Sequence, residues 1–446
     1  MTRSDKTEVH AEETPGSGEV SLVIEHLFRH EAGRMVSILT GIFGPEHLTL
    51  AEDVVQEALA RALQTWPYYG MPDNPAAWIM RTSRNLALDT IRRQNVFREK
   101  EPEIIRLMEA SERPSDDPAL RGGEIADDRL RMMFVCCHPL IPPEAQVALA
   151  LKVLCGFSIP EISRAFLTTE ASIAKRLTRA KQKIREAGIP FEIPAGPDLA
   201  RRLDGVLHSL YLLFNEGYKA SEGEKLVRRE VCEEAIRLAT LLAGHPPTDQ
   251  PKTHALLALM LLNTARTPTR TDENGDLLRL KDQNRARWDR SMMARGLFHW
   301  ACSASGSEIT RYHLEAGIAA CHCTAPDYAS TDWRRILSLY DRLVEIDSSP
   351  VVALNRAVAL AEVKGPEAAL ESIANMENLR SLENYHLLHA VLGEFESRLN
   401  HPRAAAGHFQ KSLGLTTVRT EQTFLRKRLD DCEQEANIDG GKPSRA

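Results

Sequence analysis

Apolar side chains recur at intervals of three and four residues along most of the chain, with polar side chains between them. A clear example is the set Ile173, Leu177, Ala180 and Ile184, which helical geometry places on one face. Long alternating runs of β-branched residues, which would favour strands, do not occur in the sequence. The pattern therefore predicts an all-α protein with helices of ordinary length and short connections.

A short helix, a turn and a second helix are predicted between residues 158 and 188. Ser158 with Glu161 forms a capping box, and Thr169 is a good N-cap for the second helix. From Glu161 to Gly188 there are seven Lys or Arg residues against three acidic ones. This pattern is typical of a helix-turn-helix, whose second helix enters the major groove of DNA. A solvated charged helix is the alternative interpretation.

A second cationic helix is predicted after Asn74 and Pro75, which suit an N-cap and the first helical position. Opposite its apolar arc, the helix carries Arg81, Asn85, Asp89 and Arg92. A face with arginine and asparagine suits phosphate contacts and base-edge hydrogen bonds. We expect Tyr68 and Tyr69 in the preceding connection, where they could stack on unpaired bases. Trp66 and Trp78 are more simply interpreted as core residues.

The helix before this one has a different polar face. Thr49 and Glu52 predict a capping box at its start. Its apolar stripe contains Val55, Leu59, Ala62 and Trp66. Its polar face carries Asp53, Gln56 and Glu57. Because an acidic face repels DNA, we expect it to bind a basic protein surface.

The length and charge of the whole chain limit these interpretations. With 446 residues the chain is too long for one core, which predicts two to four domains. Its 56 Lys and Arg residues face 62 Asp and Glu residues, a formal net charge of -6. Phosphate attraction depends on the local field, so a basic helix in an acidic chain can still bind DNA. No stretch approaches the roughly 20 apolar residues of a membrane span, and no signal peptide is recognisable, so we expect a cytoplasmic protein without membrane contact.

Candidate chemistry is sparse. The eight cysteines are scattered, and the CCH at 136–138 and CHC at 321–323 lack the paired spacings of structural zinc sites. We therefore expect reduced, buried thiols and neither a metal nor a cofactor. TDENGDLLRL at 271–280 departs from the calcium-loop pattern and predicts a tight turn. No phosphate-binding glycine loop, H-E-x-x-H or G-x-S-x-G pattern occurs, which argues against an enzyme.

The C-terminal part is predicted to contain repeated helix pairs. VKGPEAALESI at 363–373 and LNHPRAAAGHFQ at 399–410 are spaced alike, which places Ala369 and Ala405 36 residues apart in equivalent positions. This period is close to the ~34 residues of tetratricopeptide helix pairs. A degenerate pair at 311–343 would complete the stack. LKDQNRARWDR at 280–290 fits either a contact surface between this part and the rest of the chain or a solvated helix with one packed tryptophan.

Three segments together resemble a known family. AEDVVQEALARALQTWP, NPAAWIMRTSRNLALDTIRRQ and ALALKVLCGFSIPEISRAFLTTEASIAKRLTRAKQKIRE resemble, in order and spacing, regions 2 and 4 of extracytoplasmic-function sigma factors of the sigma-70 family. YLLFNEGYKAS, HALLALMLLNTART and SPVVALNRAVALAE resemble the long C-terminal extension of one subgroup. Together with the polar composition of the tail and linker and the spacing of the repeats, the resemblance indicates these divisions: a flexible tail 1–18, region 2 at 19–100, a linker 101–127, region 4 at 128–188, a helical extension 189–300, tetratricopeptide-like repeats 301–435 and a tail 436–446.

The resemblance also implies a function, that of a bacterial subunit which binds core RNA polymerase and directs it to particular promoters. The residues matching the surface bound by the polymerase β′ clamp helices are Asp53, Gln56 and Glu57. The residues matching the part that captures the unwound -10 element are Tyr68, Tyr69, Asn74, Arg81, Arg84, Asn85, Asp89, Arg92 and Arg93. The residues matching the helix that reads the -35 element are Thr169, Ser172, Lys175, Arg176, Arg179 and Lys183. Region 4 is expected to contact the polymerase β flap.

The role of the extension is left to hypothesis. We expect it to regulate the sigma domains or to help them engage polymerase, through an intramolecular contact made by the concave surface of stacked helix pairs. A competing hypothesis is a ligand-responsive helix-turn-helix activator that does not replace a sigma factor. An enzyme housed in the extension is a third, for which the sequence offers no site.

Overall fold

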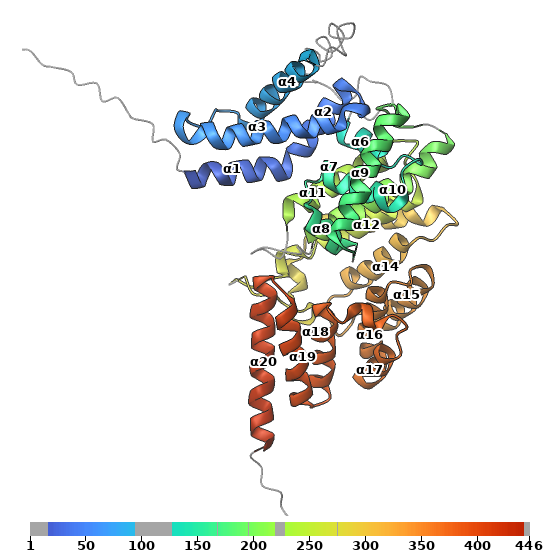
Figure 1. Cartoon of the computed structure of the whole chain (residues 1–446). Coiled ribbons are helices and arrows are strands. Elements are labelled where there is room, and N and C mark those ends of the chain that lie inside the picture. The colour runs from blue at the N-terminus through green and yellow to red at the C-terminus, as the bar shows by residue number, and fades with distance from the viewer. Residues whose placement is uncertain are drawn as a thin grey trace, which may run out of the picture. The chain divides into compact units, whose positions relative to one another are not determined.

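The computed structural model describes residues 17–93, 127–166, 168–194, 196–218, 228–273 and 275–440 (Figure 1). Within these residues the regular elements are all helices, which confirms the predicted all-α class. The predicted linker 101–127 lies outside them apart from its last residue, as do most of the tail 1–18 and the end of the tail 436–446. The chain divides into two compact units, Met1–Ser209 and Leu210–Ala446. No helix among the described residues is long and apolar enough to cross a membrane.

The first unit begins with helices that pack around a shared apolar core. Their bounds are α1 (Ser17–His30), α2 (Ala32–Phe43), η1 (Pro45–His47), α3 (Leu48–Tyr69) and α4 (Pro75–Arg93). The predicted cap of α4 is confirmed, since the Asn74 Oδ1 accepts a hydrogen bond from the Ala77 N–H at 3.0 Å. The capping box predicted at Thr49 is wrong, because α3 already begins at Leu48 and Thr49 lies inside the helix.

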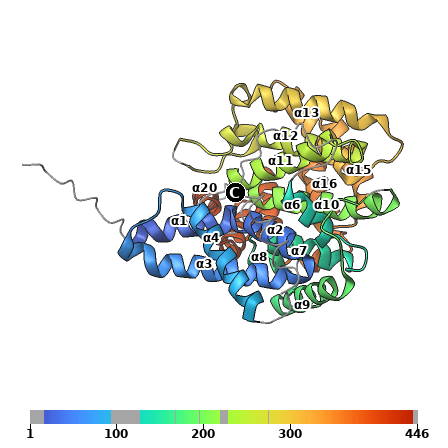
Figure 2. The ribbon, with the colours of Figure 1, turned by 90° about the horizontal axis from the view of Figure 1, so that it is seen from above.

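The same unit continues with four helices, α6 (Asp128–Cys136), α7 (Pro143–Leu154), α8 (Ile159–Ala165) and α9 (Glu170–Ala187). The last two, α8 and α9, form the predicted helix-turn-helix. Ser158 and Glu161 form the predicted capping box, and the Thr169 hydroxyl accepts a hydrogen bond from the Ser172 N–H at 3.3 Å. Helix α9 packs beside α7 and α8 (Figure 2).

The two halves of this unit meet at a close crossing of α2 and α7. A Cβ added to Gly33 of α2 would lie 2.1 Å from the carbonyl oxygen of Leu154, so only glycine fits between the two backbones. Likewise, a Cβ added to Gly41 of α2 would lie 2.9 Å from the Cε1 of Phe191, a residue in the segment after α9. Helix α2 therefore packs against helices of both halves of the first unit.

Helix α10 (Pro197–Tyr218) begins in the first unit and ends in the second. Its first half packs on the end of α6, where a Cβ added to Gly205 would lie 3.1 Å from the Sγ of Cys137. The Arg202 guanidinium donates to the Phe134 carbonyl oxygen at 3.4 Å. The first compact unit thus reaches Ser209, beyond the boundary at 188 that the sequence suggested.

The second unit is built around a helix that is buried over most of its length. This helix is α12 (Pro251–Thr264), in which Ala255 and Leu262 are fully buried. It packs against α11 (Arg229–Gly244), α13 (Arg290–Cys302) and η6 (Ser303–Ser305), and the short helices η3 (Thr267–Thr269), η4 (Leu280–Asp282) and η5 (Arg285–Arg287) lie between α12 and α13 in the sequence.

The run at 280–290 is not the solvated helix of one interpretation, because it forms η4 and η5. Trp288 is 2% exposed, and its Nε1–H donates to the Thr269 Oγ1 at 2.8 Å. The guanidinium groups of Arg266 and Arg285 lie 5.3 and 5.2 Å from its ring centroid. The preceding tight turn is confirmed, since the Gly275 N–H donates to the Asp272 carbonyl oxygen at 3.1 Å.

The remaining helices form the predicted pairs, and α18, α19 and α20 stand side by side in Figure 1. Ala369 and Ala405 are both fully buried, so each supplies the small side chain on which its pair closes. The bounds are α14 (Arg311–Thr324), α15 (Trp333–Ile346), α16 (Pro350–Lys364), α17 (Pro366–Ala374), η7 (Leu379–Leu382), α18 (His386–Arg398), α19 (Pro402–Leu415) and α20 (Arg419–Gly440).

Candidate nucleic-acid interface

The surface of α9 divides into a buried face and an opposite face, here called the basic stripe. The predicted apolar set is confirmed: Ile173 and Ile184 are fully buried, Ala180 is 1% exposed and Leu177 is 6% exposed. The stripe runs along the other side, with exposed Lys175, Arg179 and Lys183, half-buried Ser172 and Arg176, and the capping residue Thr169. The spacing brings these predicted -35 residues together on one helix.

The side chains of this basic stripe differ in how firmly they are held. The Arg176 Nη2 lies 3.0 Å from the Glu144 Oε2 of α7. The Lys183 Nζ donates to the Leu140 carbonyl oxygen at 2.8 Å. Lys175 and Arg179 make no ion pair or side-chain hydrogen bond with any described residue. Two of the four cations are therefore braced by the segment 140–144, and two project from the helix.

The predicted polar face of α4 is largely exposed. Arg81, Asn85, Asp89 and Arg92 are exposed on one side, while Ile79, Ser83, Ala87 and Ile91 are buried on the other. Arg84 is an exception, because it is 8% exposed and does not join the exposed face. The predicted residue Arg93 ends α4, and its side chain lies outside the described residues.

The two tyrosines do not lie in the connection where the sequence analysis expected them. Tyr68 and Tyr69 belong to the last turn of α3 and not to the following connection, since the helix continues past Pro67. They are 80% and 87% exposed, so both rings are available to a partner. Trp66 is 2% exposed, which confirms its core role, and it meets the half-buried Trp78 edge to face at 5.4 Å between ring centroids.

The acidic face of α3 is exposed as predicted. Asp53, Gln56 and Glu57 point away from the stripe of Val55, which is 1% exposed. Glu57 forms an ion pair with Arg61 one turn later, with the Nε 2.9 Å from the Oε1. Two carboxylates and an amide within about one turn of the helix offer acceptors to a basic protein surface.

Sequence reasoning missed one pair in this region, Glu52 and Lys181. The Lys181 Nζ lies 2.6 Å from the Glu52 Oε2, and Glu52 is 7% exposed. Burial raises the pKa of Glu52, and the nearby Lys181 ammonium partly opposes that rise. The signal was the position of Lys181, four residues after Leu177 and three before Ile184, at the edge of the buried face of α9.

The cysteines are free thiols, and for Cys137 and Cys323 burial outweighs the opposite effect that nearby arginines have on the thiol pKa. Burial raises the pKa of Cys137 to about 12 and that of Cys323 to about 11, so both stay protonated at neutral pH. Among the described residues, no group of three His, Cys, Asp or Glu side chains is placed to hold a metal ion.

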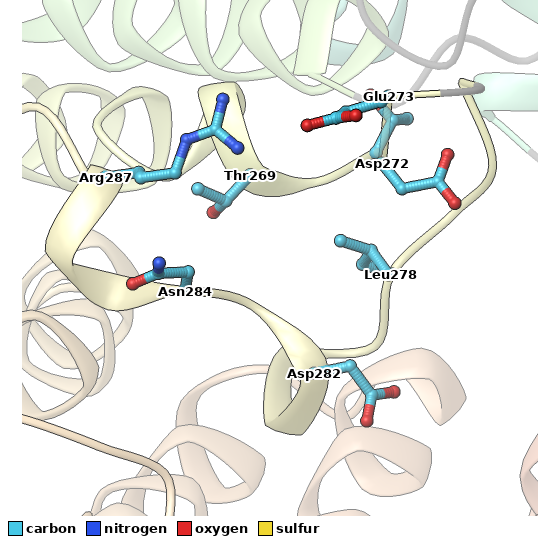
Figure 3. Close-up of a pocket in the computed structure, with 8 residues that line it drawn as sticks. Thr269, Asp272, Glu273, Leu278, Asp282, Asn284 and Arg287 are labelled. Atoms are coloured by element: carbon cyan, nitrogen blue, oxygen red, sulfur yellow. The ribbon is translucent and has the colours of Figure 1, made fainter.

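An open polar pocket of about 360 Å³ lies in the loop between α12 and α13 (Figure 3). Its acidic groups already support the loop. The Asp272 Oδ1 accepts from the Asp276 N–H at 2.9 Å, and the Asp282 Oδ2 accepts from the Arg279 Nε–H at 2.7 Å. Arg279 also reaches Glu394 of α18, at 3.3 Å. The pocket is thus part of an ion-paired loop rather than a convergent set of reactive groups.

Comparison with known proteins agrees with this arrangement. Residues 27–96 match the family Sigma-70 region 2, and residues 131–184 match the family Sigma-70, region 4. Residues 202–304 match a family of unknown function (DUF6596). No solved structure matches the chain.

Three relatives are informative. An uncharacterized protein of Rhizobium meliloti (strain 1021) is 40% identical over 385 residues, which cover 86% of this chain and 90% of that protein. The ECF RNA polymerase sigma factor SigE of Mycolicibacterium smegmatis is 28% identical over 36% of this chain and 60% of its own length. The probable RNA polymerase sigma factor RfaY of Xanthomonas campestris pv. campestris is 26% identical over 30% of this chain and 33% of its own.

The matched families fall on the two halves of the first unit, region 2 on α1 to α4 and region 4 on α6 to α9. The second unit holds most of the match of unknown function. The chain therefore belongs to the sigma-70 family, as an extracytoplasmic-function sigma factor that directs promoter-specific transcription and carries a long C-terminal extension.

Proposed function

We propose that this sigma factor reads the duplex -35 element with α9 and holds the unwound -10 element with region 2. The observation that carries the proposal is the basic stripe of α9, which is exposed on the second helix of a capped helix-turn-helix. Thr169 sets the start of that helix by capping it. In such motifs the N-terminal residues of the second helix contact base edges.

Within the stripe, position along α9 suggests a division of roles. Ser172, Lys175 and Arg176 lie in its first two turns and are placed to approach base edges. Arg179 and Lys183 lie further along and suit phosphate contacts. Arginine at either position suits bidentate contact with guanine or phosphate.

For the -10 element we propose a stacking surface beside a polar helix. Tyr68 and Tyr69 present exposed rings on which unpaired bases can stack. Asn74, Arg81, Asn85, Asp89, Arg92 and Arg93 supply the polar contacts. Stacking and hydrogen bonding of captured bases offset the energy lost when the duplex opens. Arg84 is buried in this conformation, so its predicted contact requires a rearrangement of α4.

The acidic face of α3 is proposed to bind the clamp helices of the polymerase β′ subunit, with region 4 on the β flap. Asp53, Gln56 and Glu57 are exposed together, and their charge suits a basic partner. Reversing the charge of Asp53 and Glu57 to lysine should weaken binding to core polymerase at least about tenfold, since each buried charge pair at an interface contributes about 1.5 kcal/mol or more. Unchanged binding of the double variant would contradict this assignment.

The proposal has a geometric consequence for the first unit. Elements centred at -10 and -35 lie about 25 base pairs apart, or ~85 Å along duplex DNA. A compact unit of about 200 residues has a radius of gyration of ~17 Å, and therefore a diameter of roughly 45 Å. Regions 2 and 4 must separate before one chain can hold both elements. The contacts to be broken include the Gly33 crossing and the pair of Glu52 with Lys181.

For the extension we propose regulation of the sigma domains or of their engagement with polymerase, in a cytoplasmic protein with no catalytic activity or cofactor of its own. The competing activator hypothesis is disfavoured by matches to both sigma regions. Direct binding of core polymerase by the purified chain separates the two, because an activator that does not replace a sigma factor has no need of it.

A further inference from the structure

The basic stripe of α9 is flanked by a segment of region 4 that the proposed function does not use. This segment connects α6 to α7 and includes the first turn of α7. It touches the stripe at two points, through Glu144 on Arg176 and through the Leu140 carbonyl oxygen on Lys183. Since residues 176 and 183 lie two helical turns apart, the segment runs along the stripe.

We propose that Glu144 is a positioning residue, which orients the Arg176 guanidinium for a base contact in the -35 element and so sharpens sequence preference. The inference rests on the proposed reading of -35 DNA by α9. A guanidinium has five N–H donors in a planar fork. Holding one Nη2 against a carboxylate leaves other donors of the fork for a base edge and limits the rotations of the side chain.

The choice of Arg176 follows from comparison with its neighbours on the helix. Its side chain is 30% exposed, and it lies in the N-terminal half of α9. Arg179 is exposed and has no described partner, so it adapts to a phosphate wherever it lies. A base contact needs a fixed donor direction, whereas a phosphate contact needs mainly positive charge.

The presence of a glutamate at position 144 also has a simpler explanation. An acidic residue in the first turn of a helix is favoured by the helix dipole, and the Glu144 side chain is 70% exposed. Such an exposed pair adds little stability. A negative charge beside a DNA-binding helix also lowers general affinity for a polyanion. The two roles therefore predict different results when the charge of Glu144 is removed. If Glu144 positions Arg176, sequence preference is lost. If Glu144 has only the simpler role, sequence preference is unchanged and general affinity for DNA rises.

The test uses holoenzyme assembled from core polymerase and the full chain, selected on a duplex library randomised through the -35 element. Arg176→Ala identifies the base positions that Arg176 reads, with an expected loss of preference of roughly 5- to 150-fold for a bidentate contact. Glu144→Gln should reduce preference at those same positions by roughly threefold, while affinity averaged over all sequences holds or rises.

The matched control is Glu186→Gln, which removes the same charge from α9 at a carboxylate whose hydrogen-bond partner is Gln182. It should leave base preference unchanged. In an Arg176→Ala background, Glu144→Gln should have no further effect on preference, whereas a merely structural Glu144 would act equally in both backgrounds.

The outcomes distinguish the positioning role of Glu144 from the proposed reading of -35 DNA by α9. If Arg176→Ala removes a base preference and Glu144→Gln does not, the positioning role is overturned and the reading of -35 DNA by α9 stands. If Arg176→Ala changes no preference, the positioning role falls too. If substitutions along the whole stripe also leave -35 preference intact, the proposed reading by α9 fails with it.

Discussion

The Nζ of Lys181 lies 2.6 Å from the Oε2 of Glu52, and this ion pair joins α9, the helix proposed to read the -35 element, to the start of α3 in region 2. Glu52 is almost fully buried, whereas the Lys181 side chain is 24% exposed. The two partners therefore differ in what their removal leaves behind. A carboxylate without its partner would stay in the interior, while an ammonium without its partner can reach water.

This asymmetry predicts unequal effects on stability. Lys181→Ala leaves the Glu52 carboxylate buried and unpaired, and should lower the free energy of unfolding of the first unit by about 3 kcal/mol. Glu52→Gln removes the buried charge and should cost less than about 1 kcal/mol. Urea unfolding followed by the fluorescence of Trp66 and Trp78 measures both variants. Equal losses would show that the pair is not buried as described.

The pKa of Glu52 gives a pH dependence with a definite sign. Burial holds the folded-state pKa above its ordinary value, so the unfolded chain releases the proton first as pH rises. The contribution of Glu52 to stability is therefore full at acid pH and is lost as pH rises through the folded-state pKa. Relative to Glu52→Gln, the natural chain should lose stability between acid and neutral pH. A difference that stays constant or changes the other way would contradict the cause assigned to this shift.

The crossing of α2 and α7 predicts that Gly33 tolerates no side chain. Gly33→Ala would place a Cβ 2.1 Å from the Leu154 carbonyl oxygen, which is backbone and cannot swing aside. We expect a loss of about 2 kcal/mol in the stability of the first unit. Gly18→Ala in α1 is the control, since no atom lies within 4 Å of that Cβ position. It should be neutral or slightly stabilising, and equal behaviour of the two variants would place α2 elsewhere.

The exposed tyrosines predict a defect confined to DNA opening. Tyr68→Ala and Tyr69→Ala should each reduce the affinity of holoenzyme for single-stranded -10 DNA by roughly 5- to 150-fold, because each stacked base contributes about 1 to 3 kcal/mol. Binding to duplex -35 DNA should be unchanged. Leu63→Ala, at an exposed apolar residue of the same helix, serves as control. Unimpaired opening by the double tyrosine variant would remove these rings from the site.

Local patterns predicted most of the helices and their caps, because apolar spacing and capping residues act within a few neighbouring residues. The apolar set around Ile173 and the cap at Thr169 were correct for this reason. Arg84 shows where family resemblance and local pattern diverged. It directly follows Ser83 and lies three residues before Ala87, both fully buried, so helical spacing itself turns it towards the core.

Contacts between distant segments were not predictable from the sequence. Nothing near Gly33 indicates that Leu154 will lie against it, since 121 residues separate the two. The same holds for Glu144 and Arg176, whose residue types fit a solvated surface equally well. The capping box expected at Thr49 failed because α3 already begins at Leu48, and Glu52 is paired with Lys181 of α9 instead. Tertiary packing decided the role of Glu52.

Run-off transcription from a genomic promoter library tests the central claim most directly. Purified core polymerase is supplied with the full chain, with the fragment 1–209 that retains the Arg202 contact, or with neither. The full chain should restore initiation at specific promoters, and a difference between it and the fragment measures the contribution of the extension. Failure of the full chain to initiate at any promoter, with duplex DNA still bound, would contradict the account.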